Sequence, residues 1–123
     1  VVVGIEARGF IFGAAVAYEL GIGFVPVRKA GKLPGETHSE TYDLEYGSAV
    51  IEIHTDALAS GTRTLVIDDI LATGGTAAAT CELIEHAGGR VVAVEVLVEL
   101  GFLGGRTKLA GRAVHSMVLV ARP

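Results

Sequence analysis

The amino-acid sequence predicts an α/β fold: a mostly parallel twisted sheet flanked by helices, with a hairpin lid. Short apolar runs alternate with helical segments along the chain, which is the pattern of a parallel sheet. One apolar run ends in two acidic residues and leads into a glycine-rich turn, an order typical of ligand-binding α/β folds. With 123 residues, 50% of them hydrophobic, residues 1–123 can form one core, so we expect a single domain.

The first strand–helix unit lies at the start of the chain. Val1–Ile5 is apolar enough for a buried strand, and Phe10–Leu20 is predicted to be the helix that follows it. Gly21 ends this helix, because glycine readily adopts the left-handed conformation found at helix C-termini. Phe24–Val27 is then predicted to be a second buried strand.

A polar stretch after the second strand predicts a lid. The segment GKLPGETHSE, residues 31–40, contains two glycines and a proline and lacks apolar periodicity, so we expect it to be mobile. Thr41–Tyr46 and Ala49–His54 alternate in polarity, which predicts a hairpin that turns around Gly47 and Ser48.

The second half of the chain continues the alternation. We expect strands at Thr64–Ile70, Val91–Leu100 and Val114–Val120, a helix at Gly75–Ala87, and a loop or short helix at Gly101–Gly111.

The segment LVIDDILATGGTAAA, residues 65–79, carries the most specific chemistry. A buried strand would present Asp68 and Asp69 at its carboxyl end, where open α/β sheets bind ligands. The turn that follows contains Gly74 and Gly75, whose backbone N–H groups can converge on an anion at a helix N-terminus. Carboxylates suit sugar hydroxyls or a divalent cation, so the pattern indicates a sugar phosphate. The alternative is a solvated acidic pair followed by an ordinary turn.

This segment differs from two common phosphate motifs. No lysine follows the glycines as a P-loop requires, and no GxGxxG pattern marks a dinucleotide site. It resembles the phosphoribosyl-pyrophosphate (PRPP) motif of the type I phosphoribosyltransferases.

Charge and composition exclude several other classes of function. A net charge of −4 argues against general nucleic-acid binding, and no apolar stretch approaches the length that spans a membrane. We therefore expect a cytoplasmic protein that binds neither nucleic acid nor membranes. Cys81 is the single cysteine and is predicted to pack in a helix rather than to react, and the four histidines show no metal-ligand spacing.

Three further clusters of residues accompany the motif. Glu6-Ala7-Arg8-Gly9 lies at a strand-to-helix junction, and Arg28, Lys29 and Lys32 provide three cations within five positions. These residues could bind a second anionic group such as pyrophosphate, or they could be solvated. The third cluster, YDLEYG at residues 42–47, is either a polar hairpin strand or part of a binding site.

Together the segments EARGFIFG, RKAGKLPGETHSETYDLEYG and VIDDILATGGT are similar to the adenine branch of the type I phosphoribosyltransferases. The similarity covers nearly the whole chain and fades after Glu99. It implies the type I fold, a reaction of PRPP with adenine that gives AMP and pyrophosphate, Mg²⁺ bound to PRPP, and a homodimer.

The resemblance also implies roles for individual residues. The ribose 5′-phosphate would bind to Ala72, Thr73, Gly74, Gly75 and Thr76. Asp68 and Asp69 would hold the ribose hydroxyls or the Mg²⁺ shell, without a direct protein site for the metal.

On the pyrophosphate and base sides, the resemblance implies a second set of roles. Arg8 with the backbone at Ala7 would face pyrophosphate, and Arg28, Lys29 and Lys32 would add positive charge, Lys32 from the lid. Ile70 would pack on the base, Glu45 would donate a proton to the purine, and Tyr46 would lie beside it.

Two alternatives remain beside the adenine enzyme. The chain begins inside a predicted strand and without Met, so we expect an amino-terminal portion, including the hood over the base, to be missing. Without the hood, a transferase for xanthine or another 6-oxopurine is possible. A non-catalytic PRPP-sensing regulator would use the same phosphate site.

Overall fold

The computed structural model describes residues 1–44 and 46–123, and these contain strands, helices and one 3₁₀ turn. The strands are β1 (Val2–Ile5), β2 (Phe24–Lys29), β3 (Thr37–Asp43), β4 (Ser48–His54), β5 (Arg63–Leu71), β6 (Arg90–Leu100) and β7 (Val114–Val120). The helices are α1 (Gly9–Leu20), α2 (Gly75–His86) and α3 (Gly105–Lys108), and the 3₁₀ turn is η1 (Gly101–Leu103).

The described strands form one sheet in the order β3-β4-β2-β1-β5-β6-β7. β2, β1, β5, β6 and β7 are parallel, whereas β4 is antiparallel to both β2 and β3. This arrangement confirms the predicted mostly parallel sheet with a hairpin. In the described part of the chain, no helix is long and apolar enough to cross a membrane.

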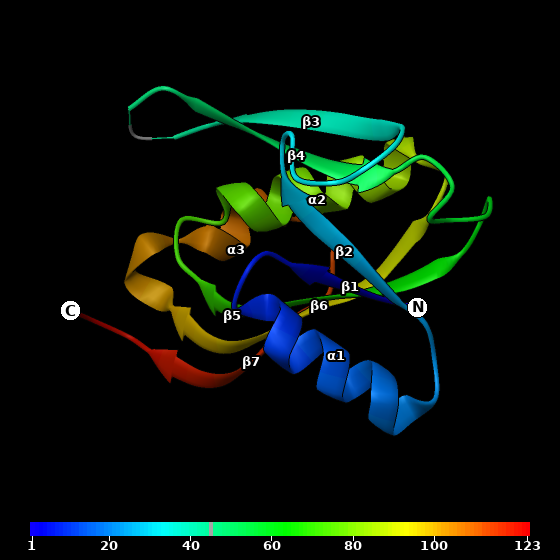
Figure 1. Ribbon diagram of the computed structural model, residues 1–123. Coiled ribbons are helices and arrows are strands. Elements are labelled where there is room, and N and C mark those ends of the chain that lie inside the picture. The colour runs from blue at the N-terminus through cyan, green and yellow to red at the C-terminus, as the bar shows by residue number, and fades with distance from the viewer. Residues whose placement is uncertain (45) are drawn as a thin grey trace.

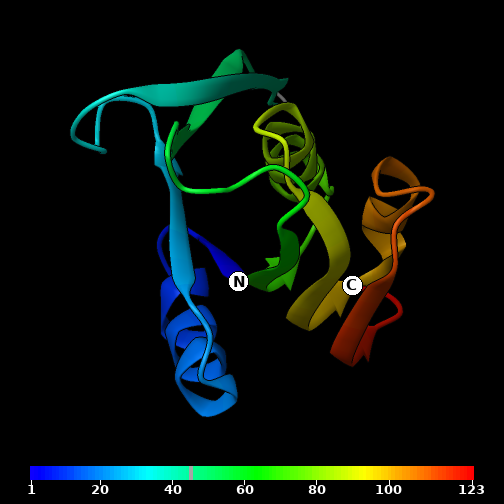
Figure 2. The same ribbon diagram turned by 90° about the vertical axis from the view of Figure 1, so that its right-hand side faces the viewer.

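The helices lie on opposite faces of the sheet. Figure 1 shows α1 against one face and α2 against the other, with the β3–β4 hairpin folded over the outer side of α2. Figure 2 shows the same arrangement from the side, with α2 between the hairpin and the parallel strands. As a result, the hairpin reaches the end of the sheet at which α2 begins.

Alternating side chains of β1 supply the two halves of the core. Val3 belongs to the larger cluster, which includes Leu83 and Ile84 of α2, and Val2 belongs to a smaller cluster with Ala17 of α1. Successive side chains of a strand point to opposite faces, so one short strand can be buried on both sides.

Most predicted elements are confirmed within one or two residues, but the lid prediction was partly wrong. Residues 37–40 belong to β3, which begins at Thr37 rather than Thr41. Glu52 of β4 explains this difference, because its carboxylate accepts hydrogen bonds from the hydroxyls of Thr37 (2.8 Å) and Ser39 (3.2 Å). The carboxylate also accepts the backbone N–H of Gly31 at 2.8 Å. The segment outside regular structure is therefore limited to residues 30–36.

The glycine-rich loop between β5 and α2 packs directly against the backbone of α3. Gly74 has a φ of +88°, and a Cβ added to it would lie 2.5 Å from the carbonyl oxygen of Gly105. A Cβ added to Gly105 would lie 2.6 Å from the carbonyl oxygen of Ala72. Both positions require glycine, because real Cβ atoms do not approach backbone atoms this closely.

An ion pair holds the other side of α3 against β6. Nε and Nη2 of Arg106 donate to the two carboxylate oxygens of Glu99 at 2.8 and 3.0 Å. Nη1 of Arg106 donates to the carbonyl oxygen of Val114, and Ser116 donates to Glu99, each at 2.8 Å. The hydrogen bonds from Arg106 hold the pKa of Glu99 below its ordinary value.

We predict that Glu99→Ala lowers the free energy of unfolding by about 2 kcal/mol or more, because it leaves Arg106 without its partner in a site where Glu99 is only 5% exposed. Urea denaturation measures this change. Glu95→Ala is the matched control on the same strand, since Glu95 pairs only with the exposed His115. Its expected effect is below about 1 kcal/mol. Equal effects of both substitutions would contradict the assigned importance of the Glu99–Arg106 pair.

We also predict that Gly74→Ala destabilises the protein, because the methyl group would meet the Gly105 carbonyl and because alanine is strained at this φ. The expected loss is about 1–3 kcal/mol, measured by thermal or urea unfolding. Gly31→Ala is the control, since Gly31 also has a positive φ (+86°) but has nothing within 4 Å of its Cβ position. A Gly74→Ala variant no less stable than Gly31→Ala would show that α3 does not constrain the loop.

Candidate active site

A pocket of about 540 Å³ opens at the carboxyl ends of β1 and β5. One wall is the loop that follows β1, with Glu6, Ala7 and Arg8. The other wall is formed by the end of β5 and the first residues of α2, from Asp68 to Ala77, and Leu100 closes the side. The two motifs that the sequence singled out are therefore brought together in one cavity, although about sixty residues separate them along the chain.

The floor of the pocket is the turn at the start of α2, whose groups can bind an anion. Gly74 is the N-cap of this helix and supplies no side-chain hydrogen bond, and the first turn contains no acidic residue. The first N–H groups of the helix therefore remain available, and the helix dipole adds positive potential at the same point. The hydroxyl of Thr76 donates to that of Tyr42 of β3 at 3.1 Å, which ties the hairpin to this turn.

Two carboxylates stand beside the anion site. Burial is the main cause that raises the pKa of Asp68 to about 7; the backbone N–H of Asp69 opposes the rise, and the carboxylate of Asp69 adds to it. Oδ1 of Asp68 accepts the backbone N–H of Asp69 at 2.9 Å, and the Asp69 carboxylate forms an ion pair with the guanidinium of Arg8. The pair thus contains one carboxylate that titrates near neutral pH and one that is charge-compensated.

Glu6 binds two of the cations near the pocket. Its side chain is only 9% exposed, and its carboxylate accepts from Nε of Arg28 at 3.0 Å and from Nζ of Lys32 at 2.7 Å. It also accepts the backbone N–H of Lys29 at 3.1 Å. Burial by itself would raise the pKa of Glu6, but the hydrogen bonds from Lys32, Lys29 and Arg28 outweigh it and lower the pKa below its ordinary value.

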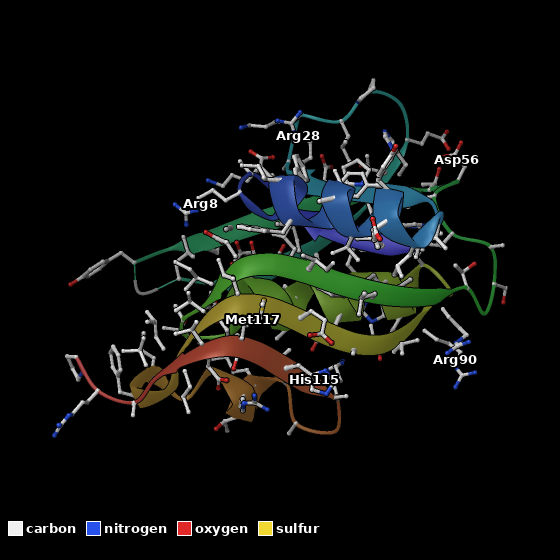
Figure 3. All side chains as sticks on the ribbon, turned by 90° about the horizontal axis from the view of Figure 1, so that it is seen from below. Arg8, Arg28, Asp56, Arg90, His115 and Met117 are labelled. Atoms are coloured by element: carbon white, nitrogen blue, oxygen red, sulfur yellow. The ribbon has the colours of Figure 1, made fainter. Side chains whose placement is uncertain are left out.

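The predicted cationic cluster lies at the same end of the sheet as the pocket. In Figure 3, Arg8 and Arg28 lie toward the left of the molecule and Arg90 lies at the right. Lys29 contributes its backbone to Glu6, while its side chain is exposed and does not line the pocket. Among the described residues, the cations in contact with the pocket's own carboxylates are therefore Arg8, Arg28 and Lys32.

The residues expected near the base are more scattered. Ile70 lines the pocket and is 39% exposed, so its side chain is available to a ligand. Tyr46 is 87% exposed on the hairpin and does not line the pocket. Glu45, the expected proton donor, lies outside the described residues.

Sequence reasoning missed Glu6 as a site residue. The alternative that Glu6 and Arg8 are solvated was wrong for Glu6, because its carboxylate accepts hydrogen bonds from three donors and its side chain is 9% exposed, whereas the Arg8 side chain is 73% exposed. The only signal in the sequence was an acidic residue directly after a buried strand and well before the cations that it binds. The prediction that Cys81 packs in the core is confirmed, since it is fully buried and burial raises the pKa of its thiol to about 11.

Comparison with known proteins identifies the family. The phosphoribosyl transferase domain family matches residues 1–120, which includes the stretch after Glu99 where the resemblance had been expected to fade. An adenine phosphoribosyltransferase of Salinispora arenicola is 62% identical over 119 residues. These residues are 97% of this chain and 63% of that protein, so the chain spans less than two thirds of this relative.

Solved structures agree with the sequence comparison. The adenine phosphoribosyltransferase of Thermoanaerobacter pseudethanolicus superposes with a TM-score of 0.95 at 53% identity, over 97% of this chain and 69% of that one. The Saccharomyces cerevisiae enzyme, solved with an imino-altritol bisphosphate and adenine, gives 0.91 at 48% identity, over 94% and 65%. The chain therefore belongs to the phosphoribosyltransferase family and, within it, to the adenine phosphoribosyltransferases.

Proposed function

We propose that the protein transfers the 5-phosphoribosyl group of PRPP to adenine, giving AMP and pyrophosphate in purine salvage. The observation that carries this proposal is the single pocket in which the anion-binding turn, the two aspartates and the Arg8 loop meet. Family membership supports the reaction class, and the yeast relative was solved with adenine and a bisphosphate that contains a ring.

In the proposed complex, the phosphate and sugar of PRPP occupy the β5–α2 side of the pocket. The 5′-phosphate is bound by the turn from Ala72 to Thr76, where helix N–H groups and the Thr73 hydroxyl are available, whereas the Thr76 hydroxyl donates to Tyr42. Asp68 and Asp69 accept hydrogen bonds from the ribose 2′ and 3′ hydroxyls, a role for which ionised carboxylates are suited.

The pyrophosphate group faces the β1–α1 side. Arg8 and the backbone at Ala7 contact it, with additional positive charge from Arg28, Lys29 and Lys32. Cleavage at C1 of the ribose develops positive charge on the sugar and negative charge on pyrophosphate, so cations and carboxylates in these two places favour the transition state.

Mg²⁺ is the proposed cofactor and would arrive bound to PRPP. The described residues contain no group of three or more His, Cys, Asp or Glu side chains that could hold a metal, so Asp68 and Asp69, which line the pocket, fit only an ion whose other ligands come from PRPP and water. These residues would hold its hydration shell or the hydroxyls that it polarises. When bound, the ion would neutralise part of the pyrophosphate charge.

The base and the lid complete the proposal. Ile70 packs on adenine, Glu45 exchanges a proton with the purine, and Tyr46 lies next to it. Residues 30–36, which include Lys32, would close over PRPP and exclude water. We further propose a cytoplasmic homodimer that binds neither nucleic acid nor membranes.

The proposal is tested by pyrophosphate release from PRPP and Mg²⁺ on addition of adenine, hypoxanthine, guanine or xanthine. We expect release with adenine. Release only with xanthine or another 6-oxopurine would reassign the substrate, and binding of PRPP without turnover of any base would indicate a PRPP-sensing regulator.

The pKa of Asp68 generates a prediction about pH. The pKa of Asp68 is about 7 in the folded protein, whereas the ordinary value of 3.8 applies in the unfolded chain. Between these two values the carboxyl group is protonated in the folded protein and ionised in the unfolded chain. The unfolded chain therefore binds fewer protons between about pH 4 and 7, and the free energy of unfolding falls as pH rises through this range. Each unit of the pKa difference corresponds to about 1.4 kcal/mol.

We expect Asp68→Asn to flatten this fall, because asparagine does not titrate. Urea denaturation at several pH values between 4 and 8 measures the slope for both proteins. Asp56→Asn is the control, since Asp56 is an exposed carboxylate at the other end of the molecule from Arg8. An unchanged slope in Asp68→Asn would refute the assigned burial and raised pKa of Asp68.

We predict that Glu45→Gln lowers kcat for adenine by about 10²–10⁴-fold, because it removes the proposed proton donor to the purine. The KM for PRPP should change little, since the phosphate contacts lie elsewhere. Steady-state kinetics measures both constants. Glu40→Gln is the control, because Glu40 of β3 contacts His86 at the far end of α2, at 3.0 Å, rather than the pocket. Equal and small effects of the two substitutions would rule out the role of Glu45.

A further inference from the structure

The anion site at the start of α2 has an unusual distribution of charge. Its wall carries Asp68, whose pKa is raised to about 7, and Asp69, whose carboxylate is paired with Arg8, so neither residue adds positive charge. Arg8 is paired with Asp69, and Arg28 and Lys32 are paired with Glu6 on the opposite side. The PRPP motif also lacks the lysine that a P-loop would provide. The turn itself therefore contributes backbone and hydroxyl groups but no positive side chain.

A lysine from α3 lies beside the first residue of α2, next to the pocket but not among the residues that line it. Nζ of Lys108 is 4.0 Å from the place where a Cβ on Gly75 would stand, at the first residue of α2. The same place is 3.5 Å from the ring of Tyr42 and 3.8 Å from the carbonyl oxygen of Asp43, so Lys108 and the hairpin approach Gly75 together. Within residues 1–44 and 46–123, Lys108 forms no ion pair with a carboxylate.

This placement is electrostatically unfavourable for the protein by itself. The N-terminus of a helix carries a partial positive charge, and a lysine there is destabilising unless an anion lies between the two. Lys108 is exposed and its ammonium approaches the first residue of a twelve-residue helix, so an anion bound at the first turn would offset the unfavourable charge.

The packing of α3 sets where the side chain of Lys108 leaves the backbone. The Gly74–Gly105 contact holds the start of α3 against the turn, and the pair of Arg106 with Glu99 holds it against β6. These contacts set the direction of the short helix and hence of Lys108 at its end. The flexible stem of a lysine then allows the ammonium to reach a phosphate bound by the first turn of α2.

We propose that Lys108 is a phosphate-binding residue that supplies, from α3, the positive side chain that the turn lacks. Its ligand is a phosphate monoester dianion, the 5′-phosphate of PRPP and AMP. The inference rests on the proposed function, because it assigns a further contact within the same pocket.

Calorimetric titration of ribose 5-phosphate into the protein tests this role. We expect Lys108→Met to weaken binding about tenfold, the effect of losing one charge-assisted hydrogen bond, and Lys108→Arg to restore most of it. The salt dependence of binding should also become shallower in Lys108→Met. Arg90→Met removes the same charge at the opposite end of the molecule and should leave the affinity unchanged. Ribose 5-phosphate affinity that is equal in Lys108→Met and in the unsubstituted protein would overturn the assignment.

AMP and adenosine provide a second measurement, because they differ only in the 5′-phosphate. Lys108→Met should weaken AMP and leave adenosine unchanged, whereas equal losses for both would show a general structural effect and refute the proposal. Lys108 is exposed, so the variant should fold, and its thermal unfolding verifies this. If the unsubstituted protein bound neither ribose 5-phosphate nor AMP, the proposed function itself would fail, and the role of Lys108 with it.

Discussion

The parallel alignment of β2, β1 and β5 is the constraint on which the site depends. Ile5 is level with Val27, and Gly4 is level with Ile67, so the three strands end at one edge of the sheet. The loops that follow them carry Glu6 and Arg8, Arg28 and Lys32, and the aspartates. Each loop would be a short charged segment on its own. The shared register turns them into one pocket with carboxylates and cations at hydrogen-bonding distance.

The part of this arrangement that could be predicted follows from local rules. Apolar runs of strand length locate β1, β2 and β5, and parallel strands place ligands at their carboxyl ends. Asp68, Asp69 and the glycine-rich turn could therefore be placed at one edge of the sheet from the sequence, and the structure brings them into one pocket, while their phosphate and sugar roles stay a prediction. The cations after β2 could be placed at the same edge by the same rule. In these cases the charged or glycine residues lie within a few positions of the apolar run that predicts the strand.

The parts that could not be predicted depend on contacts between distant segments. The docking of α3 rests on backbone atoms of Gly74 and Gly105, and a backbone contact leaves no side-chain pattern in the sequence. The early start of β3 depends on Glu52, whose three hydrogen-bond donors come from polar residues that resemble a loop. Glu6 looked solvated because its partners, Arg28 and Lys32, are 22 and 26 residues away.

The ion pairs of Arg8 with Asp69, and of Arg28 and Lys32 with Glu6, mean that the protein supplies counterions for its own binding groups. An incoming anion therefore exchanges partners with a carboxylate instead of meeting an uncompensated charge, and its net gain is the difference between two pairings. An anion with a single charge would interact with these cations about as strongly as the carboxylate that it displaces, so its net gain in free energy would be small. A ligand with linked phosphates can replace several pairings in one event. We therefore expect these ion pairs to favour ligands with linked phosphates over small anions, without any steric barrier.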